Sequence, residues 1–248
     1  MSPPAHRRHA PLAPAQLSLP GSQGRGGRRP GAGHPKTGRT KVAHRSRPRV
    51  TRHTPVHVTL KVRPDLPNLR RGAVFRLIRG VLREVCDGDA FRVCHFTVQA
   101  THVHLVCEAT EANVLAAGLH RLALRVVKRV NAALDRHGRV FAERYHARVL
   151  ATPREVKNAL RYVLLNGRKH AAQRGQRIGP DWFDPCSSAA WFDGWSKRLP
   201  WREPWMRALR SQAPATAPAR SWLLSIGWRE KCGPLSLHET PGPRPEAT

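Results

Sequence analysis

Acidic residues, paired cysteines and long apolar runs are all scarce in this 248-residue chain. Sixteen Asp and Glu stand against 44 Lys and Arg, which gives a formal net charge of +28. A compact domain with this charge repels itself unless an anionic partner balances it, and nucleic acid is the usual one. The composition therefore predicts a partner rich in phosphate.

No apolar run approaches the ~18 residues needed to cross a bilayer. Residues 11–20 are interrupted by prolines and lack the apolar core of a signal peptide. A basic protein on a membrane surface would carry an amphipathic Lys/Arg helix with bulky apolar residues opposite, and none stands out. We expect no membrane partner and a cytoplasmic, nucleoid-associated location.

The cysteines form an odd set without a C-x-x-C pair: Cys86, Cys94, Cys107, Cys186 and Cys232. This spacing indicates neither a zinc cluster nor a disulfide framework. Reduced thiols, mostly buried, are the expected state in a cytosolic protein. A zinc-structured protein is therefore the weakest of the alternatives.

The composition changes along the chain and suggests four segments. Residues 1–53 are rich in Pro, Gly, Arg, Ser and His, and no acidic residue precedes Asp65. Such a segment buries too little apolar surface to offset its chain entropy, so we predict a disordered basic arm. A folded domain is expected over residues 54–170, a tryptophan-rich extension over 171–232 and a disordered tail over 233–248.

Hydrophobic periodicity predicts the secondary structure of the folded domain. Apolar and polar residues alternate over 56–62, which indicates a half-buried strand, and residues 91–99 and 101–109 are expected to pair as an antiparallel hairpin. Helical spacing covers 69–85, 112–134 and 152–170, and residues 140–151 form an ambiguous β segment. The last helix begins with a capping box, in which Thr152 caps, Pro153 suits the first turn and Glu155 completes the motif.

This order of elements predicts an α+β fold, an antiparallel sheet with helices packed on one face. The opposite face would then carry the polar alternates of the strands and would be open to a ligand. These alternates include His57, Thr59, Lys61, His102 and His104.

Two histidines in the strand-like run THVHLVCEA share one face of that strand. Because side chains alternate along a strand, His102 and His104 point the same way, and Val103 points into the opposite layer. Two imidazoles one pleat apart can hold one divalent ion. With 14 histidines in the chain, an H-x-H tripeptide is expected by chance about once, so a second feature is needed.

The helix over 152–170 supplies this feature as a polar stripe of residues four apart: Asn158, Tyr162, Asn166 and His170. A tyrosine at this spacing can be an ordinary half-buried aromatic. It can also be a nucleophile, which needs a base or a metal-activated substrate because a phenol attacks poorly until it loses its proton. Asn166 offers a carbonyl oxygen suited to a hard cation.

The joint pattern resembles a known family. His102-Val103-His104 is similar to the His-hydrophobic-His signature of HUH endonucleases, and its spacing to Tyr162-Val163-Leu164-Leu165-Asn166 is similar to that of the single-tyrosine HUH transposases. The stretches RVFAERYHARVL and NALRYVLLN resemble the REP-associated tyrosine transposase branch of bacterial proteins. The resemblance covers residues 54–170 and reaches into WFDPCSSAAWFDGW.

The resemblance implies a ferredoxin-like or RRM-like fold and a DNA transposase that cleaves and rejoins single-stranded or hairpin DNA. It implies that Tyr162 attacks the scissile phosphate and leaves a 5′-phosphotyrosine and a free 3′-hydroxyl. His102 and His104 would hold Mg²⁺ or Mn²⁺, with Asn166, where some relatives carry Gln, as third ligand. His170, one turn further on, can substitute for Asn166. Relatives act as monomers or as dimers, so both states remain open.

Other residues fit around this assignment. The second tyrosine of the chain, Tyr145, is interpreted as structural or DNA-contacting, because it shares no polar helical stripe with ligand candidates. The tryptophans either stack on unpaired bases or dock the extension onto the core. Phosphate attraction that weakens with salt is assigned to nearby basic residues: Lys61, Arg144, Arg148, Arg161, Arg168 and Lys169.

Two competing functions remain. The first is a protein of the same fold that binds hairpin DNA but has lost the catalytic activity. An RNA-binding module on a similar open sheet is the second, and it would show aromatic residues on the central strands. The exposed positions of those strands carry His and Thr, which argues against it.

Overall fold

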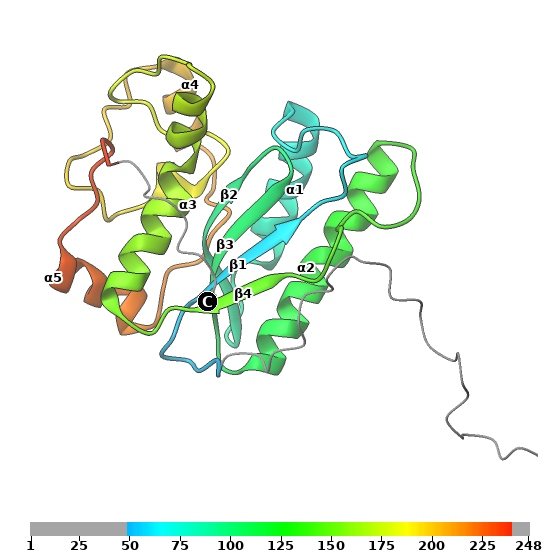
Figure 1. The fold of residues 1–248 in the computed structure, drawn as a ribbon, viewed down its shortest axis with the longest axis horizontal. Coiled ribbons are helices and arrows are strands. Elements are labelled where there is room, and N and C mark those ends of the chain that lie inside the picture. Colours follow the sequence, from blue (N-terminus) through cyan, green and yellow to red (C-terminus); the bar gives the residue numbers. More distant parts are fainter. Residues whose placement is uncertain (1–48, 240–248) are drawn as a thin grey trace, which may run out of the picture. The chain divides into compact units, whose positions relative to one another are not determined.

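The computed structural model describes residues 49–239. Most of the predicted basic arm, up to residue 48, and the end of the predicted tail, from residue 240, lie outside the described residues. The folded domain contains, in chain order, β1 (Val56–Lys61), α1 (Gly72–Val85), β2 (Phe91–Val98), β3 (His102–Ala109), α2 (Ala112–Ala133), β4 (His146–Val149) and α3 (Pro153–Gln173). The extension adds a 3₁₀ helix (Ser188–Trp191), α4 (Pro204–Arg210), a π-helical turn (Leu223–Gly227) and α5 (Trp228–Cys232) (Figure 1).

The strands form one four-stranded antiparallel sheet in the order β2-β3-β1-β4 (Figure 1). The predicted α+β class is confirmed, and the predicted hairpin is β2 paired with β3. The ambiguous segment supplies only the short edge strand β4, next to β1. The capping box is also present, with Thr152 accepting from the Glu155 backbone N–H and Glu155 accepting from that of Thr152.

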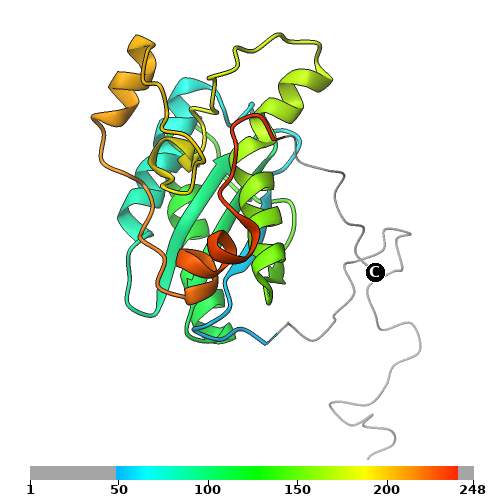
Figure 2. The same cartoon turned by 90° about the vertical axis from the view of Figure 1, so that its left-hand side faces the viewer.

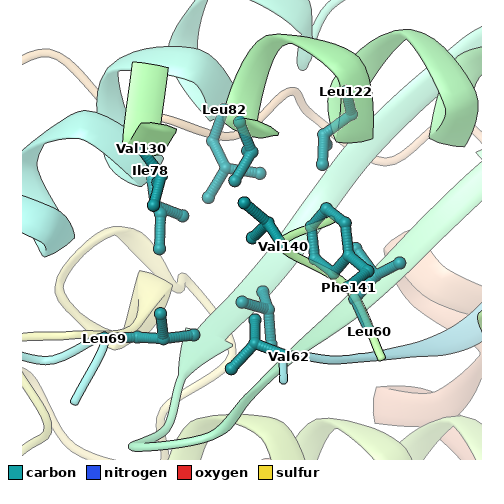
Figure 3. A pocket seen from close by; sticks show the side chains of 11 residues that line it. Leu60, Val62, Leu69, Ile78, Leu82, Leu122, Val130, Val140 and Phe141 are labelled. Atoms are coloured by element: carbon teal, nitrogen blue, oxygen red, sulfur yellow. The ribbon is translucent and has the colours of Figure 1, made fainter. Parts of the chain in front are cut away.

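One face of the sheet is covered by α1 and α2. Alternate residues of the strands, among them Val58, Leu60 and Leu105, meet Val81 of α1 and Leu122 of α2 in one buried cluster. A cavity of about 10 Å³ lies inside this cluster, and Figure 3 shows that its lining side chains are all apolar. A void this small with no polar group cannot hold a polar ligand, so the functional site lies elsewhere.

The opposite face is covered too, by α3 and the extension, which lie in front of the sheet in Figure 2. The prediction that all helices share one face and leave the other open is therefore wrong. The apolar stripe of α3, including Leu160 and Val163, needs a partner surface, and Val106 of β3 and Cys94 of β2 provide one. Cys94 lies on this side by the normal alternation from Val93, and the register shift that follows places His95 on this side as well, against Phe192.

Tryptophans dock the extension onto α3 and the sheet. The indole of Trp228 is buried, stacks on Phe192 with ring centroids 5.7 Å apart and donates to the Leu224 carbonyl. Trp195 donates to the Ala189 carbonyl at 3.0 Å. Leu235 is fully buried, so the packed chain continues past the predicted start of the tail at residue 233. The other domain boundaries stay predictions.

A buried ion pair holds the start of the extension. Asp184, 1% exposed, accepts two hydrogen bonds from the Arg70 guanidinium, both at 2.8 Å, and one from the Cys186 backbone N–H. Burial opposes the charge of Arg70, but Asp184 more than offsets this and raises the pKa of the guanidinium. Gly167 of α3 allows the approach, because a Cβ there would lie 2.5 Å from an Asp184 carboxylate oxygen.

The half-buried imidazole of His95 makes stability depend on pH. Burial lowers its pKa from 6.5 to about 4, and its ring packs edge-on against Phe192. Between these pH values the unfolded chain binds a proton that the folded chain does not, so stability falls as pH drops from 6.5 to 4. We expect His95→Gln to reduce the loss of unfolding free energy between pH 6.5 and pH 4 by about 3 kcal/mol, measured by urea titration. His120→Gln, at an exposed position of α2, is the control and should leave this loss unchanged. A parallel decline in both variants would contradict this assignment.

In the described part of the chain, no helix is both long enough and apolar enough to cross a bilayer.

Candidate active site

Strand β3 presents its two histidines beside β1. In the antiparallel register His102 lies opposite Lys61 and His104 lies opposite Thr59. The Thr59 hydroxyl and Nδ1 of His104 share a hydrogen bond of 3.1 Å, which fixes the orientation of the His104 ring. His104 is only 2% exposed, and the two imidazole centroids are 4.6 Å apart.

Helix α3 brings Tyr162 to the same place. Its ring meets the His104 ring edge-on, with centroids 4.9 Å apart. Tyr162 is half-buried, so the ring packs against its neighbours and still reaches solvent. A strand and a helix about sixty residues apart in sequence therefore place a phenol beside the paired imidazoles.

His57 of β1 joins the cluster, although sequence reasoning gave it no role. Its ring stacks on His104 at 5.3 Å and lies 5.8 Å from Tyr162. The signal was present in the sequence, because His57 and Thr59 alternate on one face of the first strand. What was missing was the pairing of β1 with β3, which puts that face beside His104.

Asn166 follows Tyr162 by one turn of α3 and is 1% exposed. Its side-chain nitrogen is buried and has no hydrogen-bond partner among residues 49–239. Leaving a buried amide group unsatisfied is costly, and a flip of the amide exchanges its oxygen and nitrogen. An Asn in this state is suited to receive a ligand. The alternative donor, His170, is half-buried and hydrogen-bonds Gln173 at 2.9 Å.

The two imidazoles of His102 and His104 form a site for a hard or borderline divalent ion only if Asn166 or the substrate supplies further ligands. Within residues 49–239, no group of three or more His, Cys, Asp or Glu side chains is arranged to hold a metal. The Asn166 amide oxygen and phosphate oxygens are ligands that Mg²⁺ and Mn²⁺ prefer, whereas the two imidazoles suit a transition-metal ion better than Mg²⁺. The ligand roles of His102, His104 and Asn166 stay predictions.

The predicted DNA-binding residues differ in their exposure and in the partners that their side chains have within the protein. Lys61 and Arg144 are exposed, and Lys169 is half-buried. Three arginines have internal partners: Arg148 pairs with Glu155 at 2.8 Å, Arg161 bonds Asn158 at 3.1 Å, and Arg168 donates to the Trp182 carbonyl at 2.6 Å.

Arg168 makes two more bonds to carbonyls of Gly179 and Pro180, so it holds a loop of the extension. Burial lowers the pKa of its guanidinium. We therefore interpret Arg168 as a structural residue. Tyr145 packs against the cluster under α1 and α2, on the face of the sheet opposite Tyr162.

No protein-family model matches the sequence, and no curated protein matches it either. Among solved structures, the chain is similar to a REP-associated tyrosine transposase bound to a REP hairpin, with 12% identity, a TM-score of 0.48 and coverage of 73% of this chain and 100% of that one. It is also similar to a protein of Deinococcus radiodurans R1 to which a transposase function is ascribed, with 13% identity, a TM-score of 0.34 and coverage of 56% and 99%.

Proposed function

We propose that this protein is a transposase-like enzyme that cleaves and rejoins single-stranded DNA at hairpin-forming repeats, with Tyr162 as nucleophile. The observation that carries the proposal is the tyrosine ring 4.9 Å from His104, itself 4.6 Å from the second imidazole of the H-x-H motif. A phenol beside paired imidazoles that can hold a metal ion is an arrangement suited to tyrosine attack on a phosphate. The net charge of +28 supports a nucleic-acid substrate.

In the proposed reaction, the Tyr162 hydroxyl oxygen attacks the phosphorus of a DNA phosphodiester. A bond forms between that oxygen and phosphorus, and the bond between phosphorus and the 3′ oxygen breaks. The phenol proton passes to solvent, and the leaving 3′ oxygen takes up a proton to become a hydroxyl. The product is a 5′-phosphotyrosine, which the 3′-hydroxyl of the same or another strand can attack in the reverse step.

The residues around Tyr162 have separate tasks in this reaction. A divalent ion held by His102, His104 and Asn166 would polarise the scissile phosphate and offset the charge that develops on its oxygens. Thr59 orients the His104 ring through their hydrogen bond. His57 stacks on that ring and limits its movement. Exposed Lys61 and Arg144 attract the DNA backbone.

The competing function is a protein that binds hairpin DNA without cutting it. It keeps the basic surface but needs no nucleophile, and it explains neither the phenol beside the imidazoles nor the unsatisfied Asn166 amide. An adduct assay separates the two, because only the enzyme forms a covalent bond with DNA.

The test uses radiolabelled single-stranded hairpin DNA and denaturing gels. We expect an adduct that forms with Mn²⁺, disappears with EDTA and returns when Mn²⁺ is restored. His102→Ala should slow adduct formation about a hundredfold, because loss of one ligand weakens the hold on the ion and on the phosphate. His120→Ala, exposed on α2, is the matched control and should leave the rate unchanged. An adduct that forms equally fast in EDTA would refute the metal assignment, and no adduct with any hairpin tested would favour the binding-only function.

A further inference from the structure

The extension holds an open pocket of about 410 Å³ that shares no residue with the histidine and tyrosine cluster. Three aromatic side chains line it, Phe192, Trp195 and Trp201. Three basic side chains complete the wall, Lys197, Arg198 and Arg210. The volume lies within the range of small-ligand sites, ~300–1,000 Å³. No step proposed above uses this pocket.

The Trp195 ring is fixed before any ligand arrives. Its indole N–H donates to the Ala189 carbonyl at 3.0 Å, and the buried Phe192 ring meets it edge-on at 5.0 Å. The Trp195 side chain is nonetheless half-buried, so part of it is accessible to solvent. A rigid aromatic face at the wall of a pocket is a platform on which a planar ring can stack at little entropic cost.

Trp201 provides a second and independent indication. Its φ of +47° lies in the left-handed region, which is unfavourable for a bulky residue. The surroundings maintain this conformation, because the indole lies edge-on to Phe183 at 5.8 Å and under the Arg210 guanidinium at 5.3 Å. Backbone strain that the packing maintains concentrates at ligand-binding sites. Here it directs an indole to the wall of the pocket.

The charge of the pocket favours an anion. Lys197 and Arg198 are exposed at its edge, and Arg210 lies over the Trp201 ring. The acidic residue in the wall, Asp193, pairs with Arg229 at 3.2 Å, so its charge is largely balanced. Aromatic faces combined with free cations match a ligand that has both a planar ring and a phosphate.

We propose that this pocket binds an unpaired nucleotide, with its base stacked on Trp201 or Trp195 and its phosphate attracted by Lys197 and Arg198. The choice of a DNA strand as the ligand rests on the proposed function, whereas the geometry and charge of the pocket are independent of it. A nucleotide held here would anchor the unpaired part of a strand whose scissile phosphate is presented to Tyr162. This gives the extension a role in substrate binding beyond its packing on α3.

The experiment uses the full chain carrying Tyr162→Phe, so that no covalent chemistry interferes. An unpaired eight-nucleotide DNA containing 5-iodouracil is crosslinked by light, and the crosslinked peptides are identified by mass spectrometry. We expect crosslinks to Trp195 or Trp201. By fluorescence anisotropy, Trp201→Leu should raise the Kd for this DNA about tenfold, because base–aromatic stacking is lost. The Lys197→Ala/Arg198→Ala pair should raise it by a similar factor at low salt.

Two controls separate the pocket from general effects. Trp222→Leu removes an indole that is 49% exposed and lies outside the pocket, and Arg121→Ala removes an exposed charge on α2. Both should leave the Kd within twofold. Crosslinks confined to other peptides, or an unchanged Kd in the double variant, whose exposed side chains are not needed for folding, would overturn the proposal.

Further readouts distinguish the ligand source and the dependence on the proposed function. Excess deoxythymidine monophosphate should compete weakly with the oligonucleotide, and full displacement at equal concentration would overturn the assignment to a strand. If the unmodified protein forms no DNA adduct but the crosslinks map to the pocket, the enzymatic proposal fails and the nucleotide site stands. If the adduct forms normally and the crosslinks lie elsewhere, the pocket proposal fails alone.

Discussion

Replacing Tyr162 with phenylalanine will abolish the covalent protein–DNA adduct and leave hairpin binding intact. The change removes one hydroxyl and keeps the ring that packs edge-on against His104, so it should alter stability by about 1 kcal/mol or less. In the proposed function, binding depends on basic residues and shape, which the substitution does not touch. The measurements are adduct yield on denaturing gels with Mn²⁺ and Kd by anisotropy on the same hairpin.

Tyr145→Phe is the matched control, because it is the same substitution at the only other tyrosine of the chain. Tyr145 packs on the opposite face of the sheet from Tyr162, so this variant should form the adduct at the normal rate. An adduct that persists in Tyr162→Phe and disappears in Tyr145→Phe would reverse the assignment of the nucleophile.

The elements of the folded domain were predictable because their signals are local. Alternation over residues 56–62 and helical spacing over 112–134 led directly to β1 and α2, with ends that agree within two residues. The start of α3 at Pro153 agrees with its prediction, because the capping box is encoded in four consecutive residues, Thr152 to Glu155. Only the ambiguous segment before α3 was left open, and it forms a strand of four residues.

The layer arrangement was less predictable, because it depends on long-range packing. An apolar stripe on α3 shows that the helix is buried but not which face of the sheet it covers. The structure packs this stripe on Val106 and Cys94, on the face away from α1 and α2. The error about an open sheet face follows from the assumption that α3 joins α1 and α2, which its own pattern cannot test.

In the candidate site too, the features set by local patterns were predictable and those set by long-range pairing were not. His102 and His104 were expected on one face from strand alternation alone, and their rings lie 4.6 Å apart. The nearness of Tyr162 was an expectation from the family resemblance, and the ring lies beside His104. His57 was expected on the same face of the sheet as His104 but was given no role, because its contact with His104 depends on the pairing of β1 with β3, which no local pattern determines.

Replacing Asp184 with alanine is expected to destabilise the protein by about 3–5 kcal/mol, the usual cost of removing one partner from a buried ion pair. Asp184 is 1% exposed and receives two bonds from Arg70 and one from the Cys186 backbone N–H. Its loss leaves the Arg70 guanidinium without its carboxylate partner, although the Arg70 side chain is only 26% exposed. The extension should then loosen from α1 and α3, since Arg70 precedes α1 and Gly167 of α3 lies against the carboxylate. Urea denaturation followed by tryptophan fluorescence measures the effect, because all seven tryptophans lie in the extension.

Asp181→Ala is the matched control for this prediction. Asp181 is three residues away, is 45% exposed and lies 3.9 Å from Arg202, so its loss should change the free energy of unfolding by about 0.5 kcal/mol or less. A second variant, Asp184→Asn, keeps the shape and can still accept from the Cys186 N–H, so it should fall between the control and Asp184→Ala. Equal stability of Asp184→Ala and Asp181→Ala would show that the extension is held by its tryptophans alone. A first unfolding transition in Asp184→Ala, confined to tryptophan fluorescence while the circular dichroism of the sheet persists, would instead identify this ion pair as the attachment of the extension to the domain that carries Tyr162.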